Sequence, residues 1–600
     1  MKTLQRLKAR VKILSDFYVW DVETANQIEP DVYEWCLNGR PESFIFGVIY
    51  GYNYTKVIHN LYELIETFKE ERFKGRKVFA HNATYDLNTA YGNIFTLDRM
   101  AIFNGSRFIM CSNGVCIFAD SLNIFVGQSV KTIGKQLGKD KTGMGEAGNY
   151  KISNWNNVSE KTRDINGCIR DCEIIYDALL NSFEFAGDIK VTQASLSMAY
   201  FRRYHQTMNI EHNEHTSNFW DSYFGGRTEA FFIGKTSASV FDINSSYPKA
   251  MRECRFPNPK FLRVEIKVNV NYGKKIISHY EGCVYAEVYH KKYWCGVLPI
   301  KKEGKLLFPV GRFRGCWNFN EIRFALEQGF IEIIEIDKIV YSEGMPSPFE
   351  SYVDKLFELK LEAEINHNDF WRDLYKRFAN SLYGKFAQRI SEETIYLEDI
   401  EKEYETILDY QLLGRFIKLS LFNATRNDAF LIVSTENEYS LNYSIPSFAS
   451  YITSFSRILL VKELIKNEKY KPLYCDTDSI FYEIEPDQKS SKALGEWKKE
   501  NKIVTEIIAL KNYKYIDFDK SPEEQHKIKG VPFLKYDSDG IPNIIKTGEN
   551  VYEYSNLTKT KESLRRNLEA GVLIKRKKEI SGKYDKRIIF NDGTTEPIEF

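Results

Sequence analysis

The chain has 600 residues, of which 43% are hydrophobic and 28% charged, and its 83 Lys and Arg balance 82 Asp and Glu. This composition is typical of a globular protein and not of a disordered chain, and no apolar run reaches the roughly 18 residues that a membrane-spanning helix needs. At roughly 100–200 residues per domain, the length predicts three to five domains.

The N-terminus and the cysteines give weak compartment signals. Residues 1–12 carry five basic residues and no acid, without the apolar stretch of a secretory signal, so we expect a basic leader to the first strand. An organelle presequence is the alternative. Ten cysteines without a CxxC pair indicate reduced thiols in a cytosol-like compartment and argue against zinc.

Charge is distributed unevenly along the chain. Residues 551–590 hold 11 Lys and Arg against five acids, whereas residues 392–405 hold seven acids against one lysine. A basic segment of this kind is typical of a surface that follows a nucleic-acid backbone. Charge therefore permits a polymer-binding enzyme without proving one.

The first third of the chain alternates between strand and helix patterns. Residues 13–14, 17–22 and 44–50 are rich in β-branched and aromatic residues, whereas 61–68 and 172–185 have helical periodicity. The alternation predicts an α/β domain over residues 1–190.

The remainder has a different order of elements. Residues 229–340 are rich in strand patterns, including 284–288 and 331–339. Two helical stretches at 349–364 and 369–384, separated by Asn366, His367 and Asn368, predict an antiparallel helix pair. A further helix is expected at 451–466 and a hairpin at 472–484.

Four acids of the first domain have a characteristic order. Asp21 and Glu23 lie two residues apart in a predicted strand, so both carboxylates point to one face, where a divalent metal would neutralise them. Asp86, in the run His81-Asn82-Ala83-Thr84-Tyr85-Asp86, and Asp171 complete the set, which resembles the DEDD 3′–5′ exonucleases with their RNase H-like fold. The resemblance implies metal ligation by Asp21, Glu23 and Asp171, although scattered surface acids are the alternative.

One position departs from that family. Its members place a water-orienting Tyr four residues, or a His five residues, before the last acid, and here those positions are Gly167 and Asn166. We therefore expect the metal cage without its usual water-orienting group.

Two further acidic motifs lie beyond the first domain. Asp242 follows the β pattern of 239–241 and begins the run Asp-Ile-Asn-Ser-Ser-Tyr-Pro, which brings Tyr247 to the same rim. Asp476 and Asp478 share one face of the predicted hairpin, in apolar surroundings where an uncompensated acid pair would cost several kcal/mol. This pair favours a metal site over a solvated turn.

The second predicted helix of the pair carries a polar face. Lys376, Asn380, Tyr383 and Gly384 lie on one side of it, which suits a triphosphate at one end and a base at the other. Lys360, on the preceding helix, adds a cation, whereas Lys355 is better explained as an ordinary solvated lysine.

Together these motifs resemble those of the family B DNA polymerases. The runs 242–248, 376–384 and 474–479 resemble DxxSLYP, with Ser246 where Leu is usual, KxxxNSLYG and YxDTDS. Lys511-Asn512-Tyr513 resembles the later KxY motif, and Tyr223-Phe224-Gly225-Gly226 resembles the YxGG/A linker. The order is also the family's, and the resemblance covers about residues 13–590.

Within the family, the protein-primed branch of linear-genome phages, viruses and plasmids is most similar. It carries one insertion that contacts a priming terminal protein and another that helps to encircle DNA. Ser121 and Leu122 resemble a single-strand-binding motif of this branch, and Lys141 is the candidate for its exonuclease lysine.

The resemblance implies an α/β and α+β multidomain protein, with an exonuclease domain followed by a right-hand polymerase of palm, fingers and thumb. The expected parts are the exonuclease (1–190), the linker and first palm segment (191–255), the first insertion with palm strands (256–345), the fingers (346–388), the second insertion (389–445), the palm (446–518) and the thumb (519–600).

The resemblance also assigns site residues. It implies Mg²⁺, which Mn²⁺ can replace, bound by Asp242, Ile243 through its carbonyl, Asp476 and Asp478. It implies nucleotide binding by Tyr247, Lys360, Lys376, Asn380 and Tyr383. It implies DNA binding by Asn82, Ser121, Leu122, Tyr223, Gly225, Gly226, Gly384, Lys511 and Tyr513.

The expected enzyme is a template-directed DNA polymerase with a 3′–5′ exonuclease. Its expected partners are template and primer DNA, dNTPs and a terminal protein, with no membrane. It is expected to act as a monomeric catalytic subunit in the cytoplasm of a phage or plasmid host cell, or in an organelle. The alternatives are a nucleic-acid-primed family B polymerase, a nuclease whose polymerase half only binds DNA, and a non-catalytic DNA-binding protein.

Overall fold

The computed structural model describes residues 1–8, 15–24, 44–92, 94–141, 158–412, 416–421, 428–439, 441–487, 490–531, 544–548, 551–557, 573–579 and 584–600. The predicted strand at 13–14 and part of the basic segment 551–590 lie outside these residues.

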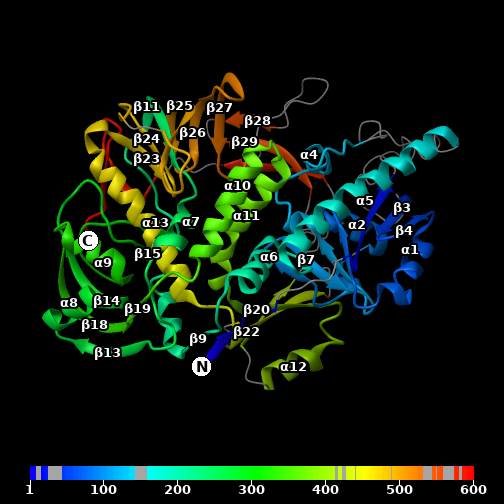
Figure 1. The fold of residues 1–600 in the computed structure, drawn as a ribbon, viewed down its shortest axis with the longest axis horizontal. Helices are drawn as coiled ribbons and strands as arrows, with labels where there is room; N and C mark the ends of the chain where they lie inside the picture. The colour runs from blue at the N-terminus through cyan, green and yellow to red at the C-terminus, as the bar shows by residue number, and fades with distance from the viewer. Residues whose placement is uncertain are drawn as a thin grey trace.

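The N-terminal domain is a seven-stranded mixed sheet with helices packed against it (Figure 1). Its central strands β2, β5 and β8 run parallel, and the flanking strands are antiparallel. In spatial order the strands are β4 (Tyr54–Ile58), β3 (Phe44–Gly51), β2 (Phe17–Thr24), β5 (Lys77–Ala80), β8 (Ile117–Asp120), β7 (Arg107–Ser112) and β6 (Ile102–Asn104). The helices are α1 (Leu61–Thr67), α2 (Ala83–Tyr91), α3 (Ile94–Leu97), α4 (Val130–Gln136) and α5 (Val158–Ala186), with short turns at Glu71–Phe73 and Ser121–Asn123.

Helix α5 covers the centre of this sheet. It packs on β2 and β3, and the ring of Tyr176 stacks on that of Phe17 at 4.6 Å between centroids. The predicted α/β alternation is confirmed here, and the helix expected at 172–185 begins 14 residues earlier.

A second seven-stranded sheet occupies the other half of the molecule. Its strand order is β10 (Thr228–Ala230), β23 (Pro472–Asp476), β24 (Ser479–Tyr482), β11 (Gly234–Ile243), β25 (Trp497–Ala509), β26 (Asn512–Asp517) and β27 (Ser521–Ile528). All its pairings are antiparallel. Helices α7 (Ser246–Glu253) and α13 (Pro446–Lys466) accompany it, and Leu460 and Leu464 of α13 pack on Phe241 and Ile480 of the sheet.

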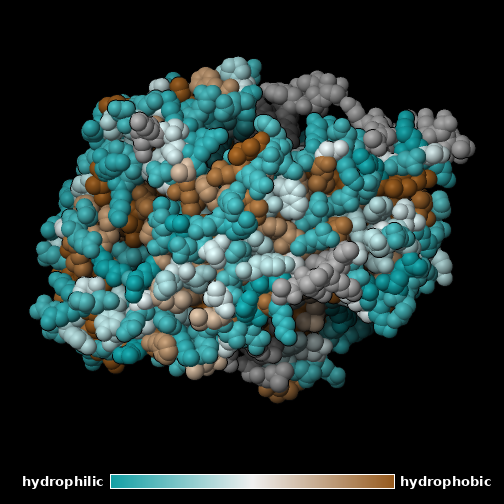
Figure 2. All heavy atoms as spheres, viewed as in Figure 1, coloured by the Kyte–Doolittle hydropathy of each residue, from teal (hydrophilic) through white to brown (hydrophobic). Residues whose placement is uncertain are grey.

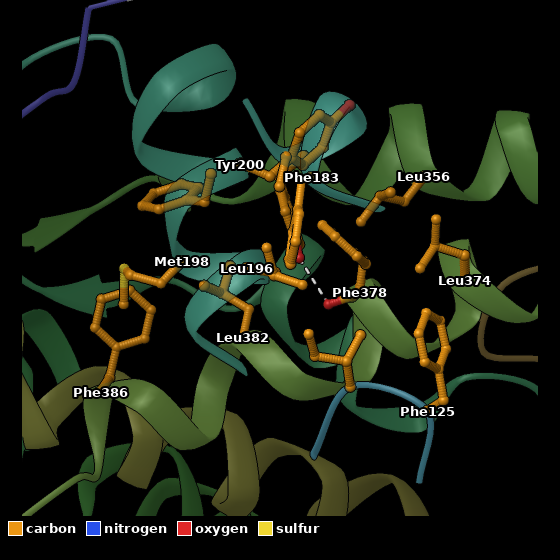
Figure 3. Close-up of a cluster of buried hydrophobic side chains, with 14 of the residues drawn as sticks. Phe125, Phe183, Leu196, Met198, Tyr200, Leu356, Leu374, Phe378, Leu382 and Phe386 are labelled. Carbon is orange, nitrogen blue, oxygen red and sulfur yellow. Dashed lines mark hydrogen bonds between the residues drawn. The ribbon is translucent and has the colours of Figure 1, made fainter. Parts of the chain in front are cut away.

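The predicted antiparallel helix pair is confirmed as α10 (Glu350–Ile365) and α11 (Asp369–Phe386), which stand between the two sheets (Figure 1). Side chains of the N-terminal domain, of α6 (Gln193–Tyr200) and of this pair share one apolar core (Figure 3). The Tyr352 hydroxyl, inside that core, donates to the Phe378 carbonyl at 2.6 Å. One continuous core therefore joins the domains.

Residues 256–345 form a unit with its own core. Four strands, in the order β13 (Arg263–Val268), β18 (Ile331–Ser342), β14 (Glu281–His290) and β17 (Gly311–Asn318), pack on α8 (Val270–His279) and α9 (Phe319–Glu327). Shorter strand pairs are β12 (Phe256–Pro257) with β19 (Gly344–Met345), and β15 (Ile300–Lys302) with β16 (Lys305–Leu307).

Residues 389–445 include a small three-stranded sheet. It consists of β20 (Ile390–Leu397), β22 (Ala429–Tyr439) and β21 (Phe416–Leu421), with α12 (Tyr404–Leu412) beside it. Its contacts run to the N-terminal domain: the Tyr396 amide donates to the Arg99 carbonyl at 3.1 Å, and the Phe430 ring lies 5.0 Å from that of Phe95.

The C-terminal residues pack against the second seven-stranded sheet (the central sheet). Strands β28 (Ile544–Gly548), β29 (Val551–Leu557) and β30 (Leu573–Glu579) form one sheet, and β31 (Arg587–Ile589) pairs with β32 (Thr595–Pro597). The buried Arg587 lies 3.4 Å from Glu229 of β10. The other small elements are β1 (Lys2–Leu4), β9 (Ile210–His212), the π-helical turn Phe201–His205 and the 3₁₀ turns Glu214–Trp220 and Glu468–Tyr470.

The face in Figure 2 is mostly hydrophilic, with hydrophobic residues scattered over it. None of the described helices is both long and apolar enough to span a membrane. The nine cysteines among the described residues are all buried and free of disulfides.

Candidate active sites

Strand pairing brings two of the predicted acids together in the central sheet. Asp242, on β11, is the register partner of Ser479 on β24, the residue after Asp478. The Ile243 amide donates to the Asp478 carbonyl at 2.7 Å. Two acids more than 230 residues apart in the chain are therefore fixed side by side by backbone hydrogen bonds.

The turn between β23 and β24 is tight and carries Asp476 and Asp478. Thr477, at its centre, has a φ of 63°, and its amide donates to the Arg227 carbonyl at 2.6 Å. The Asp476 carboxylate accepts from Thr228 Oγ1 at 3.0 Å and lies 3.2 Å from Lys511 Nζ. The structure therefore places Asp476 in contact with the linker and with Lys511.

Gly226 is the point where the linker touches this turn. A Cβ added there would come within 2.7 Å of the Thr477 Cγ2 and Oγ1 atoms, closer than ordinary contacts allow. At Gly225 a Cβ would meet no described atom within 4 Å. Packing against the described residues therefore requires a glycine at position 226 but not at position 225.

Negative charge is crowded at Asp242 and Asp478. Burial, then Asp478 and Glu500, raises the pKa of Asp242 from 3.8 to about 7. Burial, then Asp476, raises the pKa of Asp478 to about 6. Lys376 acts in the opposite direction on both. Carboxylates pressed together in this way are hard oxygen donors that fit a divalent metal.

Aromatic rings from separate elements line the side of this site. Tyr247 of α7 stacks on Tyr383 of α11 at 4.5 Å between centroids, and burial raises the pKa of each hydroxyl. Tyr223 of the linker packs against the same apolar cluster as Tyr247 and Tyr383. The structure thus brings these three predicted residues together.

The other predicted residues of α11 and α10 are less uniform. Asn380 Nδ2 donates to the Lys376 carbonyl of its own helix at 2.9 Å, and a Cβ at Gly384 would meet no described atom within 4 Å. Lys360 is mostly buried and lies 3.6 Å from Glu364, whereas Lys355 is exposed and pairs with Glu358, as expected of a solvated lysine. Lys360 therefore has an acid partner of its own.

Lys511, in the turn between β25 and β26, and Tyr513, on β26, flank the same hairpin. The Lys511 amide donates to the Tyr474 hydroxyl at 3.0 Å. The Tyr513 ring packs edge-on against Phe481 at 5.2 Å, and its hydroxyl accepts from Lys527 at 3.1 Å. Both residues lie next to the acidic turn.

The N-terminal domain holds the second acidic cluster. Asp21 and Glu23 lie on β2, and the buried Asp86 on α2 accepts from the Val22 amide at 3.1 Å. Burial, then Asp171, raises the pKa of Asp21 to about 7, and burial, then Asp21, raises the pKa values of Glu23 and Asp86 well above their ordinary range. All four predicted acids are brought together.

Helix α5 supplies the fourth acid. Lys141 Nζ contacts Asp171 Oδ2 at 2.5 Å, and Asp171 Oδ1 is buried without a hydrogen-bond partner among the described residues. Gly167 and Asn166 lie on this helix one turn before Asp171. Cys168, fully buried on the same face, has its Sγ 3.7 Å from Asp21 Oδ2.

The residues predicted to bind single-stranded DNA, Asn82, Ser121 and Leu122, are only partly exposed. Asn82, exposed at the start of α2 with a φ of 76°, has its amide held by Asp120 Oδ1 at 3.0 Å. Ser121 is fully buried, and its hydroxyl pairs with His81 Nδ1 at 2.8 Å, so its side chain supports the loop and does not face outward. Leu122, next to it, is half-buried.

The sequence analysis missed several residues of these sites. Arg457 of α13 forms a buried ion pair with Glu321 at 2.8 Å and donates to the Phe224 carbonyl at 2.6 Å and the Gly225 carbonyl at 2.9 Å. An arginine within the apolar 451–466 helix was the available signal. The Tyr85 hydroxyl contacts Thr24 Oγ1 beside Glu23, and nothing in the sequence indicated that contact.

A cavity of about 850 Å³ lies beside the linker. Most of its lining side chains are aromatic or basic, and two acids, Asp221 and Asp337, also line it. Its lining includes Trp220, Tyr223, Phe224, Lys301, Lys302, Arg312 and Arg314.

Comparisons with known proteins agree with this geometry. A family model for DNA polymerase type B, organellar and viral, matches residues 139–483, more than half of the chain. A probable DNA polymerase of Neurospora intermedia is 27% identical over 384 residues, covering 59% of this chain and 37% of that protein. The DNA-directed DNA polymerase of Enterobacteria phage PRD1 is 29% identical over 272 residues, covering 43% of this chain and 42% of that protein. The matches thus span less than half the length of these relatives.

The fold is similar to that of phi29 DNA polymerase. In its complex with primer-template DNA and incoming nucleotide substrates, that protein aligns with a TM-score of 0.66 at 16% identity, covering 94% of this chain and all of that one. The binary complex with primer-template DNA gives 0.63 at 15% identity, with the same coverage. The arrangement of an N-terminal exonuclease-like domain followed by a right-hand polymerase fold is therefore shared.

Proposed function

The chain belongs to the DNA polymerases of type B, organellar and viral, and from this membership we propose that it is a template-directed DNA polymerase with a 3′–5′ exonuclease. The observation that carries the polymerase activity is the pairing of β11 with β24, which holds Asp242 beside Asp478. Its substrates are a template, a primer and dNTPs.

The polymerase centre would hold Mg²⁺, for which Mn²⁺ can substitute. Asp242 and Asp478 are the proposed ligands, with Asp476 and the Ile243 carbonyl beside them. When bound, the ions supply the charge that makes a primer hydroxyl nucleophilic and neutralises the pyrophosphate that leaves. The raised pKa values of Asp242 and Asp478 support this assignment, since a cation relieves their repulsion.

Residues around the acids would orient the substrates. We assign Lys376 to the triphosphate, where a fixed cation favours the charge that develops in the transition state. Lys360 of α10 would also contact the triphosphate once its ion pair with Glu364 is broken. Asn380, on the same helix as Lys376, would complete the binding of the triphosphate. Tyr247 would lie under the sugar and exclude a 2′-hydroxyl, and Tyr383, stacked on it, would support the new base pair.

DNA would run past the linker and the last strands. Lys511 and Tyr513 are assigned to the primer terminus, and Tyr223, Gly225, Gly226 and Gly384 to the template side. Lys575, Arg576, Lys577 and Lys578 of β30 give the C-terminal region a basic strand suited to phosphates.

The N-terminal cluster would remove nucleotides from a 3′ end. Asp21, Glu23 and Asp171 would hold the metal, with Asp86 as the fourth acid and Lys141 beside Asp171. Asn82 and Leu122 would contact the single strand, with Ser121 supporting their loop. Because Gly167 has no side chain to orient the water, we expect slower removal than a Tyr-containing site would give.

We further propose a protein primer and a monomeric enzyme. The two inserted units, at 256–345 and 389–445, support a terminal protein as partner, since each has a sheet of its own outside the central one. The family resemblance alone supports action in the cytoplasm of a phage or plasmid host, or in an organelle.

Primer extension with Mg²⁺ tests the proposal. The wild-type chain should extend a primed template, and Asp478→Asn should reduce extension by at least about 10³-fold, while DNA binding is retained because the acid contributes no attraction to phosphate. Extension by Asp478→Asn at the wild-type rate would refute the ligand role. Adding a candidate terminal protein separates protein priming, in which its hydroxyl accepts the first nucleotide, from priming by nucleic acid.

A further inference from the structure

The N-terminal acidic centre contains a sulfur atom that its proposed function does not use. Cys168 lies on α5 one turn before Asp171, and its Sγ is 3.7 Å from Asp21 Oδ2 and 3.9 Å from the Asp21 carbonyl. The ligand atoms of Asp21, Glu23 and Cys168 all lie within 4.8 Å of one another. That spacing allows one cation to touch all three.

Asp171 gives a second, independent indication of a ligand. Its Oδ1 atom is buried and has no hydrogen-bond partner among the described residues, while Lys141 holds Oδ2. Its charge acts on both Asp21 and Glu23, so the carboxylate lies close to theirs. A buried acceptor without a partner is costly unless something in that space satisfies it.

The donor atoms decide which cation suits this space. The polymerase centre offers only oxygen, which suits Mg²⁺, whereas thiolate sulfur selects softer divalent ions. The absence of CxxC pairs argued against zinc from sequence, but one cysteine beside two carboxylates supplies a mixed donor set without such a pair.

We propose that Cys168 makes the N-terminal acidic centre a mixed oxygen–sulfur site, in which Asp21, Glu23 and the Cys168 sulfur bind a thiophilic divalent cation of the zinc and cadmium class. On binding, the metal–sulfur bond replaces the S–H bond, and the proton leaves to water. This inference deepens the proposed exonuclease and rests on its metal centre.

Cadmium titration of the metal-free, full-length chain tests the site. Thiolate bound to Cd²⁺ gives a near-ultraviolet charge-transfer band, which should rise to one equivalent and persist in excess Mg²⁺. Cys168→Ser should abolish the band. Cys116→Ser is the matched control, because Cys116 is equally buried in the same domain but packs in a different apolar cluster from Cys168, and this variant should retain the band.

Variants that keep the thiol guard against misfolding of Cys168→Ser. Asp21→Asn and Glu23→Gln should each weaken Cd²⁺ binding at least about tenfold, since loss even of ligand-orienting groups has effects of that size. Asp478→Asn should leave the band unchanged. No band in the wild type, a band that survives in Cys168→Ser, or unchanged Cd²⁺ affinity in both carboxylate variants would overturn the site.

The two proposals can fail separately. A Cys168-dependent band in a chain that never degrades a 3′ end with Mg²⁺ would support the sulfur site and overturn the exonuclease. Mg²⁺-dependent degradation without a Cys168-dependent band would do the reverse.

Discussion

At the scale of single residues, the two neighbouring glycines of the linker differ in their surroundings. A Cβ at position 226 would collide with Thr477, whereas one at position 225 would meet no described atom within 4 Å. The YxGG/A motif does not distinguish the two glycines, but their packing does.

We therefore expect Gly226→Ala to displace the turn that carries Asp476 and Asp478. It should lower the free energy of unfolding by about 1–3 kcal/mol, as overpacking does, and slow primer extension more than tenfold. Gly225→Ala is the matched control for stability, with no loss of thermal midpoint. Equal midpoints for both variants would contradict the steric argument.

The raised pKa values of Asp242 and Asp478 predict a pH dependence. Because both lie above the unfolded value of 3.8, the metal-free folded chain binds more protons than the unfolded chain between about pH 4 and 7. The contribution of these groups to stability therefore rises as the pH falls through this window. Protons also compete with the metal, so metal affinity should fall below about pH 7.

Asp242→Asn isolates this effect. Thermal midpoints of the metal-free chain at pH 5 and pH 8 should show the variant stabilised more at pH 8 than at pH 5, since Asn removes the buried negative charge. A variant destabilised at pH 8 would show that the acid is not crowded in the folded protein.

At the scale of elements, α13 ties the linker to the 256–345 unit. Its Arg457 is paired with Glu321 of α9 in a site where both side chains are almost fully buried, and it holds the Phe224 and Gly225 carbonyls. The helix thereby holds the linker that leads to β10, the strand that pairs with β23 beside the acidic turn.

Replacing one partner of the Arg457–Glu321 ion pair should destabilise the protein more than replacing both partners. Glu321→Leu alone leaves a buried cation and should cost about 3–5 kcal/mol, whereas Glu321→Leu with Arg457→Met should recover most of the stability. Extension should stay impaired in the double variant because the two carbonyls lose their donor. Urea midpoints and extension rates measure the two effects, and additive losses of stability would refute the pairing.

Much at this scale was predictable from sequence, for local reasons. The paired helices and the hairpin 472–484 follow from their own periodicity, and strand alternation placed Asp21 with Glu23. The start of α5 was missed because its first half is charged, with Lys161, Arg163 and Asp164, so no apolar stripe marks it. The nearness of Cys168 to Asp21, the burial of Ser121 and the fit of Gly226 depend on contacts between segments far apart in the chain, which no local pattern contains.

At the scale of the whole molecule, the two acidic centres lie in different sheets. Asp21→Ala with Asp86→Ala should abolish 3′–5′ degradation and leave extension within about twofold, because among the described strands β2 has no backbone pairing with the central sheet. Gel assays of degradation and extension on one DNA substrate measure both, and a matching loss of extension would show that the centres are coupled.

The apolar core shared by the N-terminal domain, α6 and the α10–α11 pair has a practical consequence for engineering (Figure 3). Excising the first domain to obtain a smaller polymerase would remove Phe185 from its ring contacts with Tyr200 and Phe378. It would also expose a large apolar surface, and such surfaces cause aggregation. Point replacements of the acids, which leave this apolar core intact, are the route to a proofreading-deficient enzyme that still folds.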